Sequence, residues 1–132
     1  MIHHSAIVVA DVDASLRFWR DGLGFDVLMD MEFDGDWPAL FGASSTRLRS
    51  IFLGHRSSRD AGIVELVVLD GVPPGFFLLS VFVADVDAAV AGLDAVALRR
   101  IDVPGPDGQR VAMATVRDPD GVMVELVGTG GD

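Results

Sequence analysis

The chain has 132 residues, half of them apolar, with a formal charge of −10 at pH 7 and no cysteine. Disulfides and thiolate metal ligands are therefore excluded, and a surface of this charge would repel phosphate backbones, so nucleic acid is not an expected partner. The longest apolar runs have the length of strands, and the N-terminus lacks a basic segment followed by an apolar one. We therefore expect no membrane span and no signal peptide, but a soluble cytoplasmic protein.

A ten-residue pattern occurs twice in the chain. IVVADVDASL (7–16) and VFVADVDAAV (81–90) each place a strand-like apolar run before Ala-Asp-Val-Asp-Ala. In both copies the first Asp, Asp11 or Asp85, is a good helix N-cap. The second Asp falls in the first turn, where the helix dipole favours a negative charge. The pattern predicts helices over about 13–23 and 86–96.

Three strand-like segments, bounded by turns rich in Gly and Pro, follow each predicted helix. They cover 25–31, 47–53 and 62–69 in the first half, and 98–103, 110–116 and 122–127 in the second. The predicted fold class is therefore α+β, with two tandem βαβββ modules forming a curved mixed sheet around a concave cup. We expect one domain over 1–132, with modules at 1–70 and 76–128, a linker at 71–75 and a flexible tail at 129–132.

The first half of the repeat is longer than the second. From the repeated Asp to the Glu of the last strand, the sequence advances 54 residues in the first half and 40 in the second. The extra residues fall in the segment 30–45, a predicted loop that contains Phe33, Trp37 and Phe41. A long loop with several large apolar groups needs a surface to lie on. Two roles stay open: a minor core beneath the loop, or a wall over a cavity in which Trp37 and Phe41 face a flat ligand.

The opening HHSAIVVADVDASLRFWRDGLGF and the closing VRDPDGVMVELVG, together with the paired βαβββ pattern, resemble the vicinal oxygen chelate superfamily. This fold group includes glyoxalase I, methylmalonyl-CoA epimerase, the extradiol dioxygenases and the bleomycin-resistance proteins. The resemblance spans the whole chain. It is specific for the fold but not for the reaction, because the family hosts unrelated chemistries on one scaffold. It also implies a homodimer, in which a cup is often completed across the interface or placed near it.

In the metal-dependent members, the ligands come from the first and last strands of each module and point into the cup. The motifs carry these positions onto His4, Glu65, Leu78 and Glu125. Leu78 replaces the expected second His, so the resemblance implies either no cofactor or one divalent metal (Mn, Fe, Ni or Zn) at an incomplete site of His4, Glu65 and Glu125. Without a metal, either Glu would be protonated, hydrogen-bonded to His4, or the counter-charge for a cationic ligand. Strand alternation places His3 on the face opposite to His4, where we expect it to pack or hydrogen-bond under the first helix.

Three functions stay open. The first is a binding protein of the glyoxalase/bleomycin-resistance type that sequesters an aromatic or cationic natural product, and it is favoured by the missing His, the aromatic insertion and the negative charge. The second is a metal-dependent lyase, isomerase or dioxygenase in which His4, Glu65 and Glu125 hold the ion and Glu125 is the catalytic base. The third is a subunit or regulator with an emptied site. The residues expected to contact a small-molecule ligand are Phe33, Trp37, Phe41, Leu78, Ser80, Phe82 and Met123.

Overall fold

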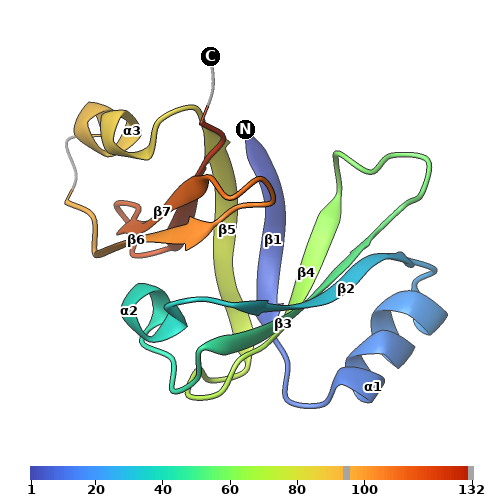
Figure 1. Cartoon of the computed structure of the whole chain (residues 1–132). Coiled ribbons are helices and arrows are strands. Elements are labelled where there is room, and N and C mark those ends of the chain that lie inside the picture. Colours follow the sequence, from blue (N-terminus) through green and yellow to red (C-terminus); the bar gives the residue numbers. More distant parts are fainter. Residues whose placement is uncertain (94–95, 131–132) are drawn as a thin grey trace.

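The computed structural model describes residues 1–93 and 96–130, and two similar halves follow one another in it (Figure 1). The first half consists of β1 (Ile2–Val8), α1 (Val12–Leu16), the wide helical turn η1 (Arg17–Gly22), β2 (Asp26–Asp34), α2 (Trp37–Phe41), β3 (Arg47–Gly54) and β4 (Ile63–Val68). The second half consists of β5 (Gly75–Val83), α3 (Val86–Gly92), β6 (Arg99–Pro104), β7 (Arg110–Arg117) and β8 (Met123–Gly128). None of the helices in the described ranges is long and apolar enough to cross a bilayer.

All eight strands form one sheet, in the order β2-β3-β4-β1-β5-β8-β7-β6. In each half the first strand pairs in parallel with the last, β1 with β4 and β5 with β8, and the halves are joined by the antiparallel pair of β1 and β5. The sheet curls, so that β2 and β3 of one half face β6 and β7 of the other across a concave space (Figure 1). The predicted α+β fold, two βαβββ modules in one curved mixed sheet, is confirmed, and both halves of the cup come from one chain.

The repeated Asp residues begin the two main helices as predicted. The side chain of Asp11 accepts a hydrogen bond from the backbone N–H of Ala14 at 3.1 Å, and Asp85 accepts one from Ala88 at 3.0 Å. After Leu16 the first helix widens, because hydrogen bonds there span five residues instead of four. The second helix ends at Gly92, earlier than expected; the predicted helical residues 94–95, and the tail residues 131–132, lie outside the described residues.

The insertion in the first half is not simply a loop. Strand β2 continues to Asp34, and the next residues fold into α2, where the Asp36 side chain caps the helix by accepting from the N–H of Ala39 at 3.1 Å. Helix α2 packs against β6 and β7 of the other half, and its Leu40 is fully buried. Of the two roles left open for this segment, the structure shows the core role for α2; that Trp37 and Phe41 face a flat ligand stays a prediction.

The alternation of side chains along each strand separates the cup from the outer core. On β3, Ser50 faces the cup, whereas Ile51 and Leu53 are fully buried on the other face, together with Leu66 of β4 and the apolar side of the first helix. In the second half Leu126 of β8 is buried in the same manner beneath α3. Each such side chain contributes about 1.5–3 kcal/mol by leaving water. The outer core thus fixes the strands whose opposite faces form the cup.

Candidate functional site

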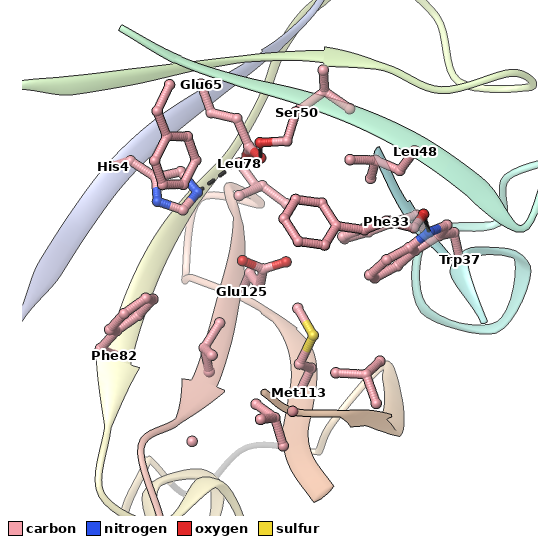
Figure 2. Close-up of a pocket in the computed structure, with 18 of the residues that line it drawn as sticks. His4, Phe33, Trp37, Leu48, Ser50, Glu65, Leu78, Phe82, Met113 and Glu125 are labelled. Atoms are coloured by element: carbon pink, nitrogen blue, oxygen red, sulfur yellow. Dashed lines mark hydrogen bonds and ion pairs between the residues drawn. The ribbon is translucent and has the colours of Figure 1, made fainter. Parts of the chain in front are cut away.

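The cup contains a cavity of about 550 Å³, within the size range of small-molecule sites (Figure 2). Most of its lining is aliphatic or aromatic, and both halves of the chain contribute to it. The residues expected as ligand contacts or metal ligands that line this cavity are His4, Phe33, Trp37, Phe41, Glu65, Leu78, Phe82 and Glu125.

Two of the expected ligand contacts, Ser80 and Met123, do not line the cavity. Ser80 is fully buried and lies behind the carboxyl group of Glu125, to which it donates a hydrogen bond. Met123 lies at the start of β8, where it packs against the buried apolar cluster that includes Leu40 and Leu78. Strand alternation places both side chains on the cup-facing side of the sheet, but neighbouring side chains cover them, so neither reaches the cavity.

One polar group on the floor of the cavity joins three strands. Glu65 of β4 places Oε1 at 3.1 Å from Nε2 of His4 on β1, and its Oε2 accepts a hydrogen bond from the Ser50 hydroxyl of β3 at 2.5 Å. His4 is 7% exposed, and its ring also lies against that of Phe52, with the ring centres 4.8 Å apart. The carboxyl group of Glu65 is therefore held in place through both oxygens.

The second carboxyl group, that of Glu125, has fewer polar partners than that of Glu65. The registers across the sheet place His4 opposite Ser80 and Ser80 opposite Glu125, which brings Glu125 beside the first polar group (Figure 2). Its Oε1 accepts a hydrogen bond from the Ser80 hydroxyl at 2.8 Å. Burial and, next, the negative charge of Glu65 raise the pKa of Glu125 to about 7, against the opposing effects of Ser80 and His4. Glu125 can therefore both take up and release a proton near neutral pH.

His3 does not lie on the face that strand alternation predicts. A register shift in the β1–β5 pairing between Ile2 and His4 turns the side chain, so that its ring stacks on Phe82 with the centres 4.3 Å apart and the planes at 2°. Its Nδ1 lies 2.8 Å from Nδ1 of His4, and burial, followed by the proximity of His4, lowers the pKa of His3. The expectation that His3 packs under the first helix is therefore wrong, because a bulge interrupts the regular alternation.

Aromatic side chains of the insertion and of β5 form one wall of the cavity. The rings of Trp37 and Phe41 are nearly parallel, at 16°, with centres 5.9 Å apart, and Phe41 meets Phe77 edge to face at 4.9 Å. The indole N–H of Trp37 donates to the carbonyl oxygen of Phe33 at 3.1 Å, which fixes the orientation of the ring. Trp37 is only 6% exposed, so a flat ligand in the cavity would meet this wall at the half-buried rings of Phe41 and Phe77.

The position of Trp37 depends on a glycine two residues before it. A Cβ atom added at Gly35 would come within 2.6 Å of Cζ2 of the indole, so a Gly35→Ala substitution must displace the ring. We expect this variant to lose about 1–3 kcal/mol of unfolding free energy in urea titrations. The matched control is Gly92→Ala in α3, where an added Cβ meets nothing within 4 Å and is expected to stabilise by roughly 0.5–1 kcal/mol. Equal effects of the two substitutions would contradict the assigned packing of Trp37.

Several lining residues are not found by reasoning from the sequence. The turn 104–106 contributes Pro104, Gly105 and Pro106, which the sequence marks only as a turn, and the curl of the sheet brings it over the cup. Ser50 and Phe52 share one face of β3 with Leu48, so strand parity is a signal that identifies them once the cup-facing side is known. The remaining lining residues not predicted are Met29, Leu48, Val67, Phe77, Val103, Val111, Met113, Val127, Gly128 and Thr129.

The three side chains expected as metal ligands, His4, Glu65 and Glu125, lie together in the cavity, but they are not arranged as a ligand set. Both oxygens of Glu65 are occupied by His4 and Ser50, and Leu78 stands where a further donor is needed. Within 1–93 and 96–130, no three His, Cys, Asp or Glu side chains are placed to share an ion. Every buried side-chain nitrogen or oxygen of these residues already has a hydrogen-bond partner. This arrangement does not fit a divalent metal.

Comparisons with known proteins agree with one another on the fold. The family model described as Glyoxalase/Bleomycin resistance protein/Dioxygenase superfamily matches residues 1–126. A curated relative, the lactoylglutathione lyase-like protein terB of Aspergillus terreus, is 32% identical over an alignment of 152 positions, gaps included, which covers 96% of this chain and 74% of the relative.

Two solved structures have the same fold at lower identity. Methylmalonyl-CoA epimerase from Mycobacterium tuberculosis is 21% identical, with a TM-score of 0.62 over 96% of this chain and 86% of that chain. A variant of methylmalonyl-CoA epimerase from Streptomyces coelicolor, in complex with 2-nitronate-propionyl-CoA, is 22% identical, with a TM-score of 0.60 over 100% of this chain and 96% of that chain. At these identities the similarity concerns the fold alone.

Proposed function

This chain belongs to the glyoxalase/bleomycin resistance protein/dioxygenase superfamily, and from that premise we propose that it is an enzyme that transfers a proton on a small substrate held in the cup, with Glu125 as the acid–base group. One observation carries the proposal: a buried carboxyl group, with a second carboxyl group close by, at the floor of an otherwise apolar cavity. Buried carboxyl groups are costly, and enzymes retain them where their basicity serves a reaction.

The two carboxyl groups have different roles in the proposed reaction. Glu65, held by His4 and Ser50, supplies a fixed negative charge that makes Glu125 more basic. Oε1 of Glu125 accepts from Ser80, which leaves Oε2 for the substrate. As a carboxylate, Glu125 takes a proton from a carbon atom next to a carbonyl group, and the electron pair of the broken C–H bond moves to the carbonyl oxygen as an enolate. As a carboxylic acid, Glu125 returns the proton to carbon, and the carbonyl group is restored. This is the chemistry of an isomerase or a lyase.

The proposed reaction class is tested by hydrogen–deuterium exchange. In heavy water, we expect the protein to accelerate exchange of the protons next to the carbonyl group of 2-tetralone or 1-indanone, two flat and uncharged ketones, as measured by proton NMR. The physical reason is that a base with a pKa near the working pH is efficient in proton abstraction from carbon. Exchange rates of both ketones that are unchanged by the protein would refute the proposal.

Sequestration of a ligand is the second candidate function, and the aromatic wall favours it. The half-buried rings of Phe41 and Phe77, backed by the buried ring of Trp37, offer an aromatic surface to a flat molecule, which a binding protein needs as much as an enzyme does. Binding of the two ketones without any exchange would favour sequestration over catalysis. Because both halves of the cup come from one chain, neither candidate depends on the homodimer that the resemblance implies.

A further inference from the structure

We propose that the cup excludes negatively charged ligands and takes flat ring compounds that are uncharged or cationic. The proposal concerns the substrate class of the same site and rests on the proposed function in that respect, although it does not require turnover. It separates this chain from proteins whose ligands are coenzyme A thioesters or glutathione conjugates, because coenzyme A carries several phosphate charges and glutathione carries two carboxylates.

The charge of the lining is the first feature that supports this selectivity. The chain contains no lysine, and among the described residues that line the cavity there is no arginine. His4 is the one lining side chain of these that can carry a positive charge, and its Nε2 already lies 3.1 Å from Glu65. Glu65 and Glu125 stand on the same floor, so a carboxylate or phosphate there meets two acidic groups, and the one lining cation that could offset them, His4, already contacts Glu65.

The direction of nearby arginines is the second feature. On β3, Arg47 and Arg49 alternate with the cup-facing Ser50, so both lie on the outer face. There Arg49 donates to both oxygens of Asp30, at 2.9 and 2.8 Å, and Nη2 of Arg47 lies 3.1 Å from Glu32. Acidic side chains of β2 thus hold these cations away from the cavity.

The shape and composition of the remaining wall are the third feature. Trp37 is only 6% exposed, so the aromatic surface that this wall presents to the cavity comes from the half-buried rings of Phe41 and Phe77, which meet edge to face at 4.9 Å. Residues 104–106 also line the cavity, whose volume of about 550 Å³ accommodates a fused-ring molecule. The cavity therefore fits a ligand whose rings contact the aromatic side chains and whose neutral or positive group lies near the carboxyl groups of Glu65 and Glu125.

The experiment compares three probes that share one ring system and differ in charge. Isothermal titration calorimetry is carried out at pH 8, where Glu125 is mostly ionised, with 2-naphthalenemethanol (neutral), 2-naphthylmethylammonium (cationic) and 2-naphthoate (anionic). We expect the neutral and cationic probes to bind, and the anionic probe to bind at least about 100-fold more weakly because two carboxyl groups face it. Coenzyme A and S-hexylglutathione are expected to give no binding heat at millimolar concentration.

Substitutions at the floor identify the source of the selectivity. In the Glu65→Gln/Glu125→Gln double variant, we expect the ratio of the dissociation constant of 2-naphthoate to that of 2-naphthalenemethanol to fall at least tenfold. Because Gln keeps the size of Glu, the neutral probe reports whether the cup is still intact; the single Glu125→Gln variant serves if the double variant does not fold. The matched surface control is Asp21→Asn, which removes an exposed carboxylate that pairs with the neighbouring Arg20 and is expected to leave all affinities unchanged.

The outcomes separate this inference from the proposed reaction. The proposed exclusion of negatively charged ligands is called the charge rule here. Equal affinity for the anionic and neutral probes would overturn it, and so would a charge preference that survives the substitutions of both Glu65 and Glu125. Failure of all three probes to bind would overturn the assignment to flat ring compounds. If the neutral probe binds as expected but ketone exchange is absent, the reaction proposal fails and the charge rule stands.

Discussion

Replacement of Glu125 by Gln is expected to reduce catalysed exchange of 2-tetralone by roughly 10²- to 10⁴-fold, the usual contribution of a general acid–base group. Gln has the shape of Glu, and its carbonyl oxygen can still accept the hydrogen bond that Ser80 donates at 2.8 Å. The cup should therefore keep its form and its affinity for 2-naphthalenemethanol while it loses the base. The exchange rate is measured by proton NMR in heavy water, and the affinity by calorimetry on the same preparations.

The matched control for this loss is Glu32→Gln on the surface, where the carboxylate lies 3.1 Å from Arg47 and outside the cup. We expect this variant to exchange 2-tetralone at the wild-type rate. If Glu125→Gln retained the full rate, Glu125 would not be the base. Parallel loss of exchange and of probe binding would instead indicate a damaged cup.

The same Glu125→Gln substitution is expected to stabilise the folded protein at alkaline pH, by on the order of 3 kcal/mol. The pKa of Glu125 rises from an ordinary value of 4.5 to about 7 on folding, so the folded state binds its proton more tightly than the unfolded state does. The stabilising proton is therefore fully present below the unfolded pKa and is lost as the pH rises through the folded pKa. Gln carries no such titration, so its advantage over Glu grows between those two values and then levels off.

Unfolding in urea measures this difference directly. We expect the two proteins to differ by less than about 1 kcal/mol near pH 5, and by the full amount near pH 8. The Glu32→Gln variant again serves as control: its free energy of unfolding should differ from that of the wild type by the same amount near pH 5 and near pH 8. A Glu125→Gln variant that is less stable than the wild type at both pH values would show that the buried carboxylate is well compensated, and would contradict the raised pKa of Glu125.

The fold could be predicted because its signals are local and repeated. Each helix begins at an Asp that caps its own chain, and each strand shows its buried face through alternation, so the two βαβββ units need no knowledge of distant contacts. Alternation also places His4, Glu65 and Glu125 toward the cup. The same rule fails at His3, because a register shift in the pairing of β1 with β5 rotates that residue, and periodicity does not encode a bulge.

The rest of the candidate site depends on contacts between the two halves. Helix α2 has only five residues, too short to be stable alone, and it exists because it packs on β6 and β7. The turn 104–106 lines the cavity only because the sheet curls toward it. Ser80 and Met123 have the correct parity for the cup but are covered by neighbours, which a sequence pattern cannot reveal.

Direct titration of the glutamate carboxyl groups tests the central claim, that Glu125 is a base poised near neutrality. The chain contains only three Glu residues, at 32, 65 and 125, so labelling with ¹³C at Cδ gives three carboxyl resonances that single Gln variants assign. We predict that the resonance lost in Glu125→Gln titrates with a midpoint at about pH 7 in the wild type. A midpoint for that resonance near the ordinary 4.5 would contradict the assignment of Glu125 as the acid–base group.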